Sequence, residues 1–172
     1  MSMLREAMAE LEDEDEVRPT VDPELSVQIE ARRPETWIPD TTERLRLYRD
    51  VAGADTVDGV YEVYQAAVDR FGRAPESAVQ LVELMALKRV GANLGLISIG
   101  YNSAQLSLGL GPDGPFDPSR LSRFLNRPGN RYRVTPEMQI VRAVTQTEWS
   151  KGLDTLRESL RELDNFVSRA GP

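Results

Sequence analysis

The fold is decided by residues 76–110, whose sequence is ESAVQLVELMALKRVGANLGLISIGYNSAQLSLGL. Residues 76–94 are apolar over most of a helical circumference, a pattern typical of a helix that lies in the centre of a core. Gly95 ends this helix. Residues 96–110 then alternate apolar residues with serine and glycine on both sides of a turn at 101–104, and this alternation predicts a β-hairpin.

Two amphipathic helices precede this stretch. The first covers residues 41–54, and Asp40 or Thr41 caps its N-terminus. The second begins after Asp55 or Thr56 and has apolar residues at positions i, i+3, i+4, i+7, i+11 and i+14, which form one stripe along a helix. The residues of this stripe are Val57, Val60, Tyr61, Tyr64, Val68 and Phe71.

Shorter elements are expected on both sides of this central part. Residues 24–31 alternate apolar and polar side chains, which indicates a half-buried strand. A short helix is predicted at 117–126, and two short strands at 132–134 and 138–144. We therefore predict an α+β fold, in which helices pack on a small, mostly antiparallel sheet and a long helix closes the chain. Its strands are expected near residues 25–30, 96–110 and 131–144.

The closing helix, expected at residues 147–169, has the most regular pattern in the chain. Its apolar residues follow a 4-3-4-3-4 spacing, which is typical of a heptad seam. Such a seam either docks on the helix's own domain or is offered to a partner. Its members are Trp149, Leu153, Leu156, Leu160, Leu163 and Val167.

The charge of the chain is concentrated at its N-terminus. The formal net charge is −7, and residues 1–17 hold seven acidic residues against one arginine. We interpret the acidic run at 12–16 as a linker that follows a short amphipathic helix at 3–11. The remaining 155 residues carry a net charge of −1. Neither a membrane-spanning run nor a signal peptide is recognised, so we expect a soluble, cytoplasmic protein.

The composition argues against several kinds of catalytic and metal site. The chain contains no Cys and no His, which removes thiol nucleophiles, disulfides, thiolate zinc sites and imidazole bases. It has no Gly-Lys pair and therefore no phosphate-binding P-loop. We expect no catalytic residue, no metal ligand and no cofactor. A small enzyme that uses an isolated pair of carboxylates needs no motif and stays open as a third hypothesis.

A locally basic segment offers an alternative function. Five arginines between residues 120 and 133 are interleaved with Phe124 and Tyr132, a composition that suits contact with phosphates and stacking on bases. Most of these arginines occupy polar faces, and Phe124 also suits a core position. The arginines are Arg120, Arg123, Arg127, Arg131 and Arg133.

Three ordered motifs lie between residues 37 and 76. They are Trp37-Ile38-Pro39-Asp40, then Arg44-Leu45-x-Leu47-Tyr48-Arg49, and then Asp69-Arg70-Phe71-Gly72-x-x-Pro75-Glu76. In order and spacing they resemble the C-terminal domain of the bacterial transcription-repair coupling factors, the Mfd family. The resemblance extends over residues 24–169, and residues 3–11 resemble the last helix before that domain.

The resemblance implies that the chain is a piece of a larger ATP-dependent DNA translocase. Proteins of this family release stalled RNA polymerase and recruit the excision-repair protein UvrA. Their last domain packs on a UvrB-like N-terminal module of the same protein, masks the UvrA-binding surface and restrains the motor. Residues 21–172 would form this regulatory domain, and residues 1–20 the helix and linker that follow the motor. A non-catalytic role is thus implied, with no membrane contact, no direct DNA contact and only indirect links to UvrA and RNA polymerase.

The resemblance also implies an interface at the end of the second helix. In the family, the helix end that bears the Asp-Arg-Phe-Gly motif lies near the masking interface, and an acidic residue there pairs with arginines of the opposite module. Asp69 and Arg70 match this motif, whereas Ala66 stands where the family has Glu. An ion pair internal to the helix end is the alternative for Asp69 and Arg70. The other motif residues are expected to be structural: Trp37, Pro39, Asp40, Arg44, Leu47, Tyr48, Arg49, Phe71, Gly72 and Pro75.

Overall fold

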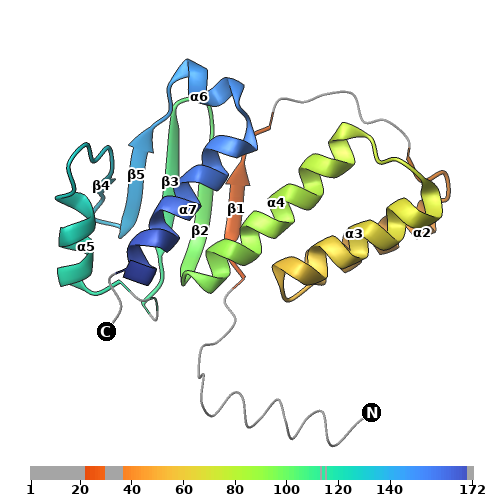
Figure 1. Cartoon of the computed structure of the whole chain (residues 1–172), viewed down its shortest axis with the longest axis horizontal. Coiled ribbons are helices and arrows are strands. Elements are labelled where there is room, and N and C mark those ends of the chain that lie inside the picture. The colour runs from red at the N-terminus through yellow and green to blue at the C-terminus, as the bar shows by residue number, and fades with distance from the viewer. Residues whose placement is uncertain (1–21, 30–36, 113, 115, 170–172) are drawn as a thin grey trace, which may run out of the picture.

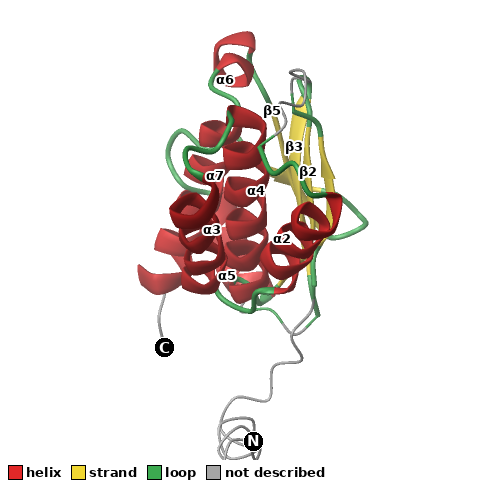
Figure 2. Cartoon of the chain, turned by 90° about the vertical axis from the view of Figure 1, so that its right-hand side faces the viewer, coloured by secondary structure: helices red, strands yellow, loops and turns green. Residues whose placement is uncertain are grey.

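The computed structural model contains one sheet with helices on one of its faces (Figures 1 and 2). The helix expected at 3–11 and the acidic run at 12–16 lie outside the part of the chain that it describes. For residues 167–169 only the backbone is described. The described residues are 22–29, 37–112, 114 and 116–169.

Within the described residues, five strands form the sheet in the order β1-β2-β3-β5-β4. β1 runs parallel to β2, and the other three neighbouring pairs are antiparallel. The prediction of a mostly antiparallel sheet is confirmed, and the structure adds the strand order, with β1 at one edge. The strands are β1 (Glu24–Val27), β2 (Leu96–Tyr101), β3 (Gln105–Leu110), β4 (Arg133–Val134) and β5 (Gln139–Ala143).

The helices begin where the sequence places capping residues. The Asp40 carboxylate accepts hydrogen bonds from two backbone N–H groups of α2, and the Thr56 hydroxyl accepts one from α3, so these two residues are the caps among the alternatives. Gly72, with φ of 86°, ends α3 as a non-helical residue. The helices are α2 (Thr41–Gly53), α3 (Val57–Phe71), α4 (Glu76–Asn93), α5 (Pro118–Leu125), α6 (Gln146–Ser150) and α7 (Leu153–Arg169).

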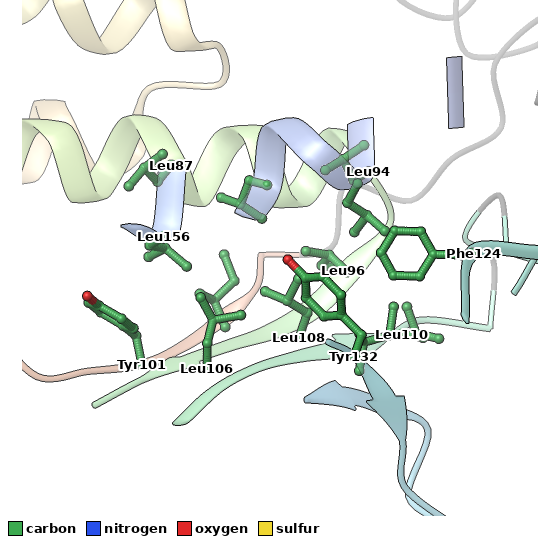
Figure 3. Close-up of a cluster of buried hydrophobic side chains, with 14 of the residues drawn as sticks. Leu87, Leu94, Leu96, Tyr101, Leu106, Leu108, Leu110, Phe124, Tyr132 and Leu156 are labelled. Atoms are coloured by element: carbon green, nitrogen blue, oxygen red, sulfur yellow. The ribbon is translucent and has the colours of Figure 1, made fainter. Parts of the chain in front are cut away.

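The larger hydrophobic core lies between the sheet and the helices α4 and α7 (Figure 3). Leu106 and Leu108 of β3 point inward, as the hairpin pattern predicts. In β2 the predicted alternation, which puts Ile97 on the same face as Ile99, is wrong: the register shifts between Leu96 and Ser98, and Ile97 is 40% exposed. Gly91 lets α4 approach β2, because a Cβ atom there would lie 2.7 Å from the Ile99 Cδ1 atom. Fully buried members of this core include Leu96, Ile99, Tyr101, Leu106, Leu108, Phe124, Ile140, Leu156, Leu160 and Leu163.

A second, smaller core lies on the other side of α4, where α2 and α3 pack against it. Val82 and Ala86 of α4 belong to this second core, whereas Leu87 and Leu94 of the same helix belong to the larger one. The prediction of a central helix that is covered on more than one side is therefore confirmed. Figure 1 shows α4 between α7 on one side and α3 on the other.

The closing helix is not continuous, which corrects the prediction of one helix over 147–169. A capping box formed by Thr145 and Glu148 starts the short helix α6. Gly152, with φ of 60°, then separates α6 from α7. Trp149 thus belongs to α6 and packs against the Tyr101 ring, with 5.2 Å between the ring centroids.

The heptad seam on α7 faces the chain's own core. Leu153, Leu156, Leu160 and Leu163 are all buried in the larger core. For these four residues, the seam therefore docks on the helix's own domain and is not offered to a partner. The Val167 side chain lies outside the described part of the chain. The first strand is also shorter than predicted, since β1 ends at Val27.

Replacing Leu156 by Ala tests the packing of α7 on the sheet. Leu156 is 0% exposed, so Leu156→Ala should lower the free energy of unfolding by about 2–5 kcal/mol, from lost apolar burial and the cavity left behind. Leu45, which is 55% exposed, is the matched control, and Leu45→Ala should change the free energy of unfolding by no more than about 0.5 kcal/mol. Urea unfolding measures both. Equal effects would contradict the placement of α7.

Candidate interaction site at the end of α3

The three sequence motifs converge where α3 ends and α4 begins. The Trp37 indole N–H donates a hydrogen bond to the Gly72 carbonyl oxygen at 3.1 Å, across 35 positions of the chain. The Trp37 ring also packs against Tyr64 of α3, with 6.3 Å between the centroids. The segment before α2 is thereby fastened to the turn after α3.

The residues after Trp37 also form hydrogen bonds that fix the start of α2. Ile38 is fully buried, and its carbonyl oxygen accepts a hydrogen bond of 3.2 Å from Arg44 Nη1. The Asp40 carboxylate accepts from the Thr42 N–H at 2.8 Å and from the Glu43 N–H at 3.3 Å. Through these contacts Trp37, Asp40 and Arg44 hold the segment before α2 and the first turn of that helix in place.

Asp69 and Arg70 lie side by side at this corner but do not bond to one another. Arg70 Nη2 forms an ion pair with Glu43 Oε1 of α2 at 2.7 Å, and its guanidinium lies 4.9 Å from the centroid of the Phe71 ring. The Asp69 carboxylate accepts a hydrogen bond of 3.0 Å from the Gln65 side-chain amide. For Arg70, an ion pair within the domain is therefore present, although its partner is on α2.

The exposure of this corner leaves its charges available to a partner. The Arg70 side chain is 63% exposed. An ion pair with so much solvent contact contributes only about 0–1 kcal/mol, so Arg70 can exchange Glu43 for another carboxylate at little cost. Asp69 and Ala66 are exposed on the same stretch of α3. We call the exposed surface formed by Ala66, Asp69, Arg70 and Arg73 the α3 corner.

The remaining motif residues divide between core and surface. Leu47 packs against the smaller core, and Pro75 occupies the N-cap position of α4. Phe71 is partly buried beneath Arg70 and belongs to neither core cluster. Tyr48 and Arg49 lie on the surface of α2.

An open hollow adjoins the α3 corner. It has a volume of about 590 Å³ and lies between the last turns of α3 and the first turns of α4. Tyr64, Val68 and Val79 contribute apolar side chains to it, and Arg73 and Glu76 contribute charged ones. The corner therefore offers a concave apolar surface beside exposed charges.

A partly buried charged network joins β5 to α6, and sequence reasoning missed it. The Arg142 side chain points from β5 into the protein, where its guanidinium donates to Glu148 Oε2 at 2.9 Å and to the Ser159 hydroxyl at 3.0 Å. Arg131 donates two hydrogen bonds, of 2.9 and 2.8 Å, to the two carboxylate oxygens of Glu148. These hydrogen bonds, with those from Thr145 and Arg142, hold the pKa of Glu148 far below its ordinary value despite its desolvation. The Thr145-x-x-Glu148 spacing, which is typical of a capping box, was the sequence signal that could have pointed to Glu148.

The burial and ion pairing of residues 120–133 argue against the nucleic-acid surface predicted there. Phe124 and Tyr132 are buried, so neither ring is available to stack on a base. Arg127 lies over the Phe124 ring and pairs with Glu162 at 3.0 Å, while Arg131 is engaged by Glu148. Three of the five arginines have no ion pair within the described part of the chain, namely Arg120, Arg123 and Arg133.

Two further observations concern chemistry and membranes. Among the described residues, no group of three or more Asp or Glu side chains gathers where it could hold a metal ion. None of the helices in this part of the chain is long and apolar enough to cross a bilayer.

A family model described as the TRCF domain matches residues 27–121, which include all three motifs and the α3 corner. The chain belongs to the TRCF domain family. The match extends from the last residue of β1 into α5 and thus contains α2, α3, α4, β2 and β3.

The TRCF chain is also similar to curated proteins named transcription-repair-coupling factor. It is 27% identical over 170 residues to the protein of Myxococcus xanthus, covering 99% of this chain and 14% of the relative. To the Escherichia coli K12 protein it is 23% identical over 141 residues, covering 82% of this chain and 12% of the relative. The Bacillus subtilis protein is 24% identical over 169 residues, 94% of this chain. The chain thus spans only about 12–14% of the length of these relatives.

A solved structure shows the same fold. The crystal structure of the C-terminal domain of a transcription-repair coupling factor superposes with a TM-score of 0.63 at 19% sequence identity. The match covers 86% of this chain and 96% of that one. The α+β arrangement is therefore the fold of that C-terminal domain.

The buried network predicts an acid-sensitive contribution to stability. Glu148→Gln should lower the free energy of unfolding near neutral pH by on the order of 3 kcal/mol, because it leaves the buried Arg142 guanidinium without a counter-charge. Since folding lowers the pKa of Glu148 from its ordinary value of 4.5, the stabilisation is fully present above that pH and is lost as the pH falls below it.

Urea unfolding followed from neutral pH to about pH 3 measures this effect. Below about pH 4.5 the stability of the unchanged chain should fall more steeply than that of Glu148→Gln. Glu137→Gln, at an exposed position in the turn between β4 and β5, is the control and should leave the pH profile unchanged. Parallel profiles for the unchanged chain and Glu148→Gln would contradict the role given to this network.

Proposed function

We propose that this chain is the non-catalytic, regulatory C-terminal domain of an ATP-dependent DNA translocase that couples transcription to nucleotide-excision repair. Membership of the TRCF domain family and the names of the curated relatives support this proposal. The chain spans a small part of those relatives, which leaves room for a motor in the rest of the protein. In this proposal residues 21–172 are the regulatory domain, and residues 1–20 connect it to the motor.

The observation that carries the proposal is the α3 corner. Its charged side chains are exposed, yet the backbone beneath them is held by the Trp37–Gly72 hydrogen bond and by the packing of α3 on α4. A charged surface on a rigid support is preorganised, so little entropy is lost when a partner binds. The adjoining hollow adds apolar area that a partner can cover.

The proposed partner is a UvrB-like N-terminal module of the same protein. When the α3 corner covers this module, UvrA is denied its binding surface and the motor is restrained. Asp69 would pair with arginines of the module, and Arg70 would exchange Glu43 for a carboxylate of the module. Because Ala66 replaces the acidic residue of the family, this interface has one charged pair fewer. In cis, the linker supplies a high effective concentration that compensates for a weak contact.

The chemistry of the described residues agrees with an interaction role. The strongly bound carboxylate, Glu148, has both oxygens engaged by arginines and the backbone, so it has no free basic site for proton transfer. The chain also has no Cys or His to act as a nucleophile or base. We therefore propose that this domain regulates by contact and performs no reaction itself.

Reversing the charge of Asp69 tests the proposal. Asp69→Arg should weaken binding of this chain to the separately expressed UvrB-like module by at least about tenfold, because it places like charges opposite one another. The domain should stay folded, since Asp69 is exposed and its carboxylate bonds only to the Gln65 side chain within the described part of the chain. Calorimetry or biolayer interferometry at low salt measures the affinity.

Asp55→Arg is the matched control, because Asp55 is exposed in the loop at the opposite end of α3. It should bind the module like the unchanged chain. Equal affinities for the unchanged chain and Asp69→Arg would remove Asp69 from the interface. No binding of the unchanged chain, either free or tethered to the module, would contradict direct masking.

A further inference from the structure

The side of α2 that faces away from the smaller core carries exposed apolar residues. Leu45 is 55% exposed and Tyr48 is 39% exposed, and both belong to the second of the three sequence motifs. Ala52, one turn after Tyr48, is exposed as well. Neither the fold nor the α3 corner accounts for these side chains. We call the surface formed by Leu45, Tyr48, Arg49 and Ala52 the outer face of α2.

The outer face of α2 is a continuous stripe along the helix. An α-helix turns by about 100° per residue, so positions 45, 48, 49 and 52 fall within about 100° of its circumference. The spacing i, i+3, i+4, i+7 is typical of a helix side that is covered by another element. The helix already uses a different side for its own domain, where Val51 is buried in the smaller core and Leu47 packs against it. The second stripe has no cover within the described residues.

The two large side chains of this stripe gain little from the isolated domain. A single exposed apolar residue is ordinary on a protein surface. Leu45 and Tyr48, however, lie one helical turn apart on the same stripe, so together with Ala52 they form a patch. Polar side chains would keep α2 equally stable at these exposed positions. The patch therefore stabilises a contact only when another molecule covers it.

The charge around the patch is positive. Arg49 lies within the outer face, and Arg46 lies at its edge; both are exposed and have no ion pair within the part of the chain that the structure describes. The acidic residues of α2 do not neutralise them. Glu43 is engaged by Arg70, and Asp50 lies about 140° around the helix from Leu45. An apolar stripe with acidic residues along one edge is the complementary surface.

Two other kinds of occupant fit this face less well. A two-fold contact between two copies of the chain would bring Arg49 of both copies into one interface, where like charges repel. A nucleic acid would place its phosphates against Leu45 and Ala52, which offer neither charge nor hydrogen bonds. Tyr and Arg side chains beside apolar ones are instead typical of the centre of protein–protein interfaces.

We propose that the outer face of α2 is a docking surface for an acidic amphipathic helix of a protein partner. Apolar residues of the partner helix pack on Leu45 and Tyr48, and its carboxylates bind Arg46 and Arg49. The small side chain of Ala52 lets the two helices approach closely. This contact goes beyond the proposed function, because it uses none of the residues of the α3 corner.

The support beneath the outer face is rigid, but the contact area is small. The Asp40 carboxylate caps α2, and Val51 fixes the helix in the smaller core, so little order is lost on binding. The distance along the helix from Leu45 to Ala52 is about 10 Å, or two turns. A contact of this size belongs to the weak, transient class of interfaces, for which we expect a dissociation constant on the order of 100 µM.

A peptide titration of the complete 172-residue chain tests the proposal. The probe is a synthetic helical peptide of about 18 residues, with leucines at i, i+3, i+4 and i+7 and glutamates along one edge of that stripe. Amide NMR signals of the isotope-labelled chain should shift in residues 41–53. The same peptide with lysines in place of the glutamates should bind at least about tenfold more weakly, because Arg46 and Arg49 repel it.

Paired variants separate the outer face from the rest of the surface. Tyr48→Asp should weaken binding of the acidic peptide at least about tenfold. Tyr61→Asp is the matched control, because Tyr61 of α3 is 41% exposed, and it should bind like the unchanged chain. The amide spectrum outside α2 reports that each variant is folded.

A charge reversal gives a readout that a purely structural role would not change. Arg49→Glu should weaken binding of the acidic peptide and strengthen binding of the lysine peptide. Arg123→Glu is its control, since Arg123 is exposed on α5, on the other side of the molecule from α2 (Figure 1), and should change neither affinity.

Four outcomes would overturn the proposal. The first is the absence of shifts in residues 41–53 at about ten times the expected dissociation constant. The second is equal binding of the acidic and lysine peptides. Self-association that Tyr48→Asp abolishes, without peptide binding, would assign the face to a second copy. Binding of a DNA duplex that Arg49→Glu abolishes, again without peptide binding, would assign it to nucleic acid. Asp69→Arg should bind the peptide like the unchanged chain, so this test and that of the α3 corner fail independently.

Discussion

The central helix α4 must be covered on two sides, and the rest of the structure depends on this constraint. A helix that is apolar over most of its circumference loses free energy of burial wherever one side stays in water. The sheet and α7 cover one side through Leu87 and Leu94, and α2 with α3 cover the other through Val82 and Ala86. In the part of the chain that the structure describes, two cores are therefore joined by one helix.

This arrangement explains how an exposed corner can be rigid. Because α3 packs on α4 and its end is fastened to Trp37, the charges at Asp69 and Arg70 are held outside either core without being loose. Elsewhere in the fold, the buried Arg142 and the largely buried Glu148 form an ion pair that joins β5 to α6. The exposed pair at the corner is weak and exchangeable, whereas the buried pair is costly to break. The molecule thus separates charges that stabilise the fold from charges that remain available to a partner.

Much of the fold could be predicted because its signals are local. The stripe of α3, the all-round apolar pattern of α4, the hairpin and the Asp40 cap each depend on residues close in sequence. The position of β1 could not be predicted, since alternation shows that Glu24–Val27 is a strand but not that it pairs with β2 about seventy residues later. The break at Gly152 was missed because the 4-3-4-3-4 spacing continues across the turn between α6 and α7. The Arg70–Glu43 contact depends on how α2 packs against α3, and the sequence motif alone does not predict this packing.

The most direct test of the account is amide hydrogen exchange at residues 66–73, compared between this chain alone and the intact parent protein at rest. If the α3 corner packs on another module of the parent, these amides should exchange more slowly in the intact protein. Residues 105–110 of β3, which lie in the sheet in both cases, provide the internal reference. Equal exchange at residues 66–73 in the two proteins would contradict the proposal that this corner is a regulatory interface.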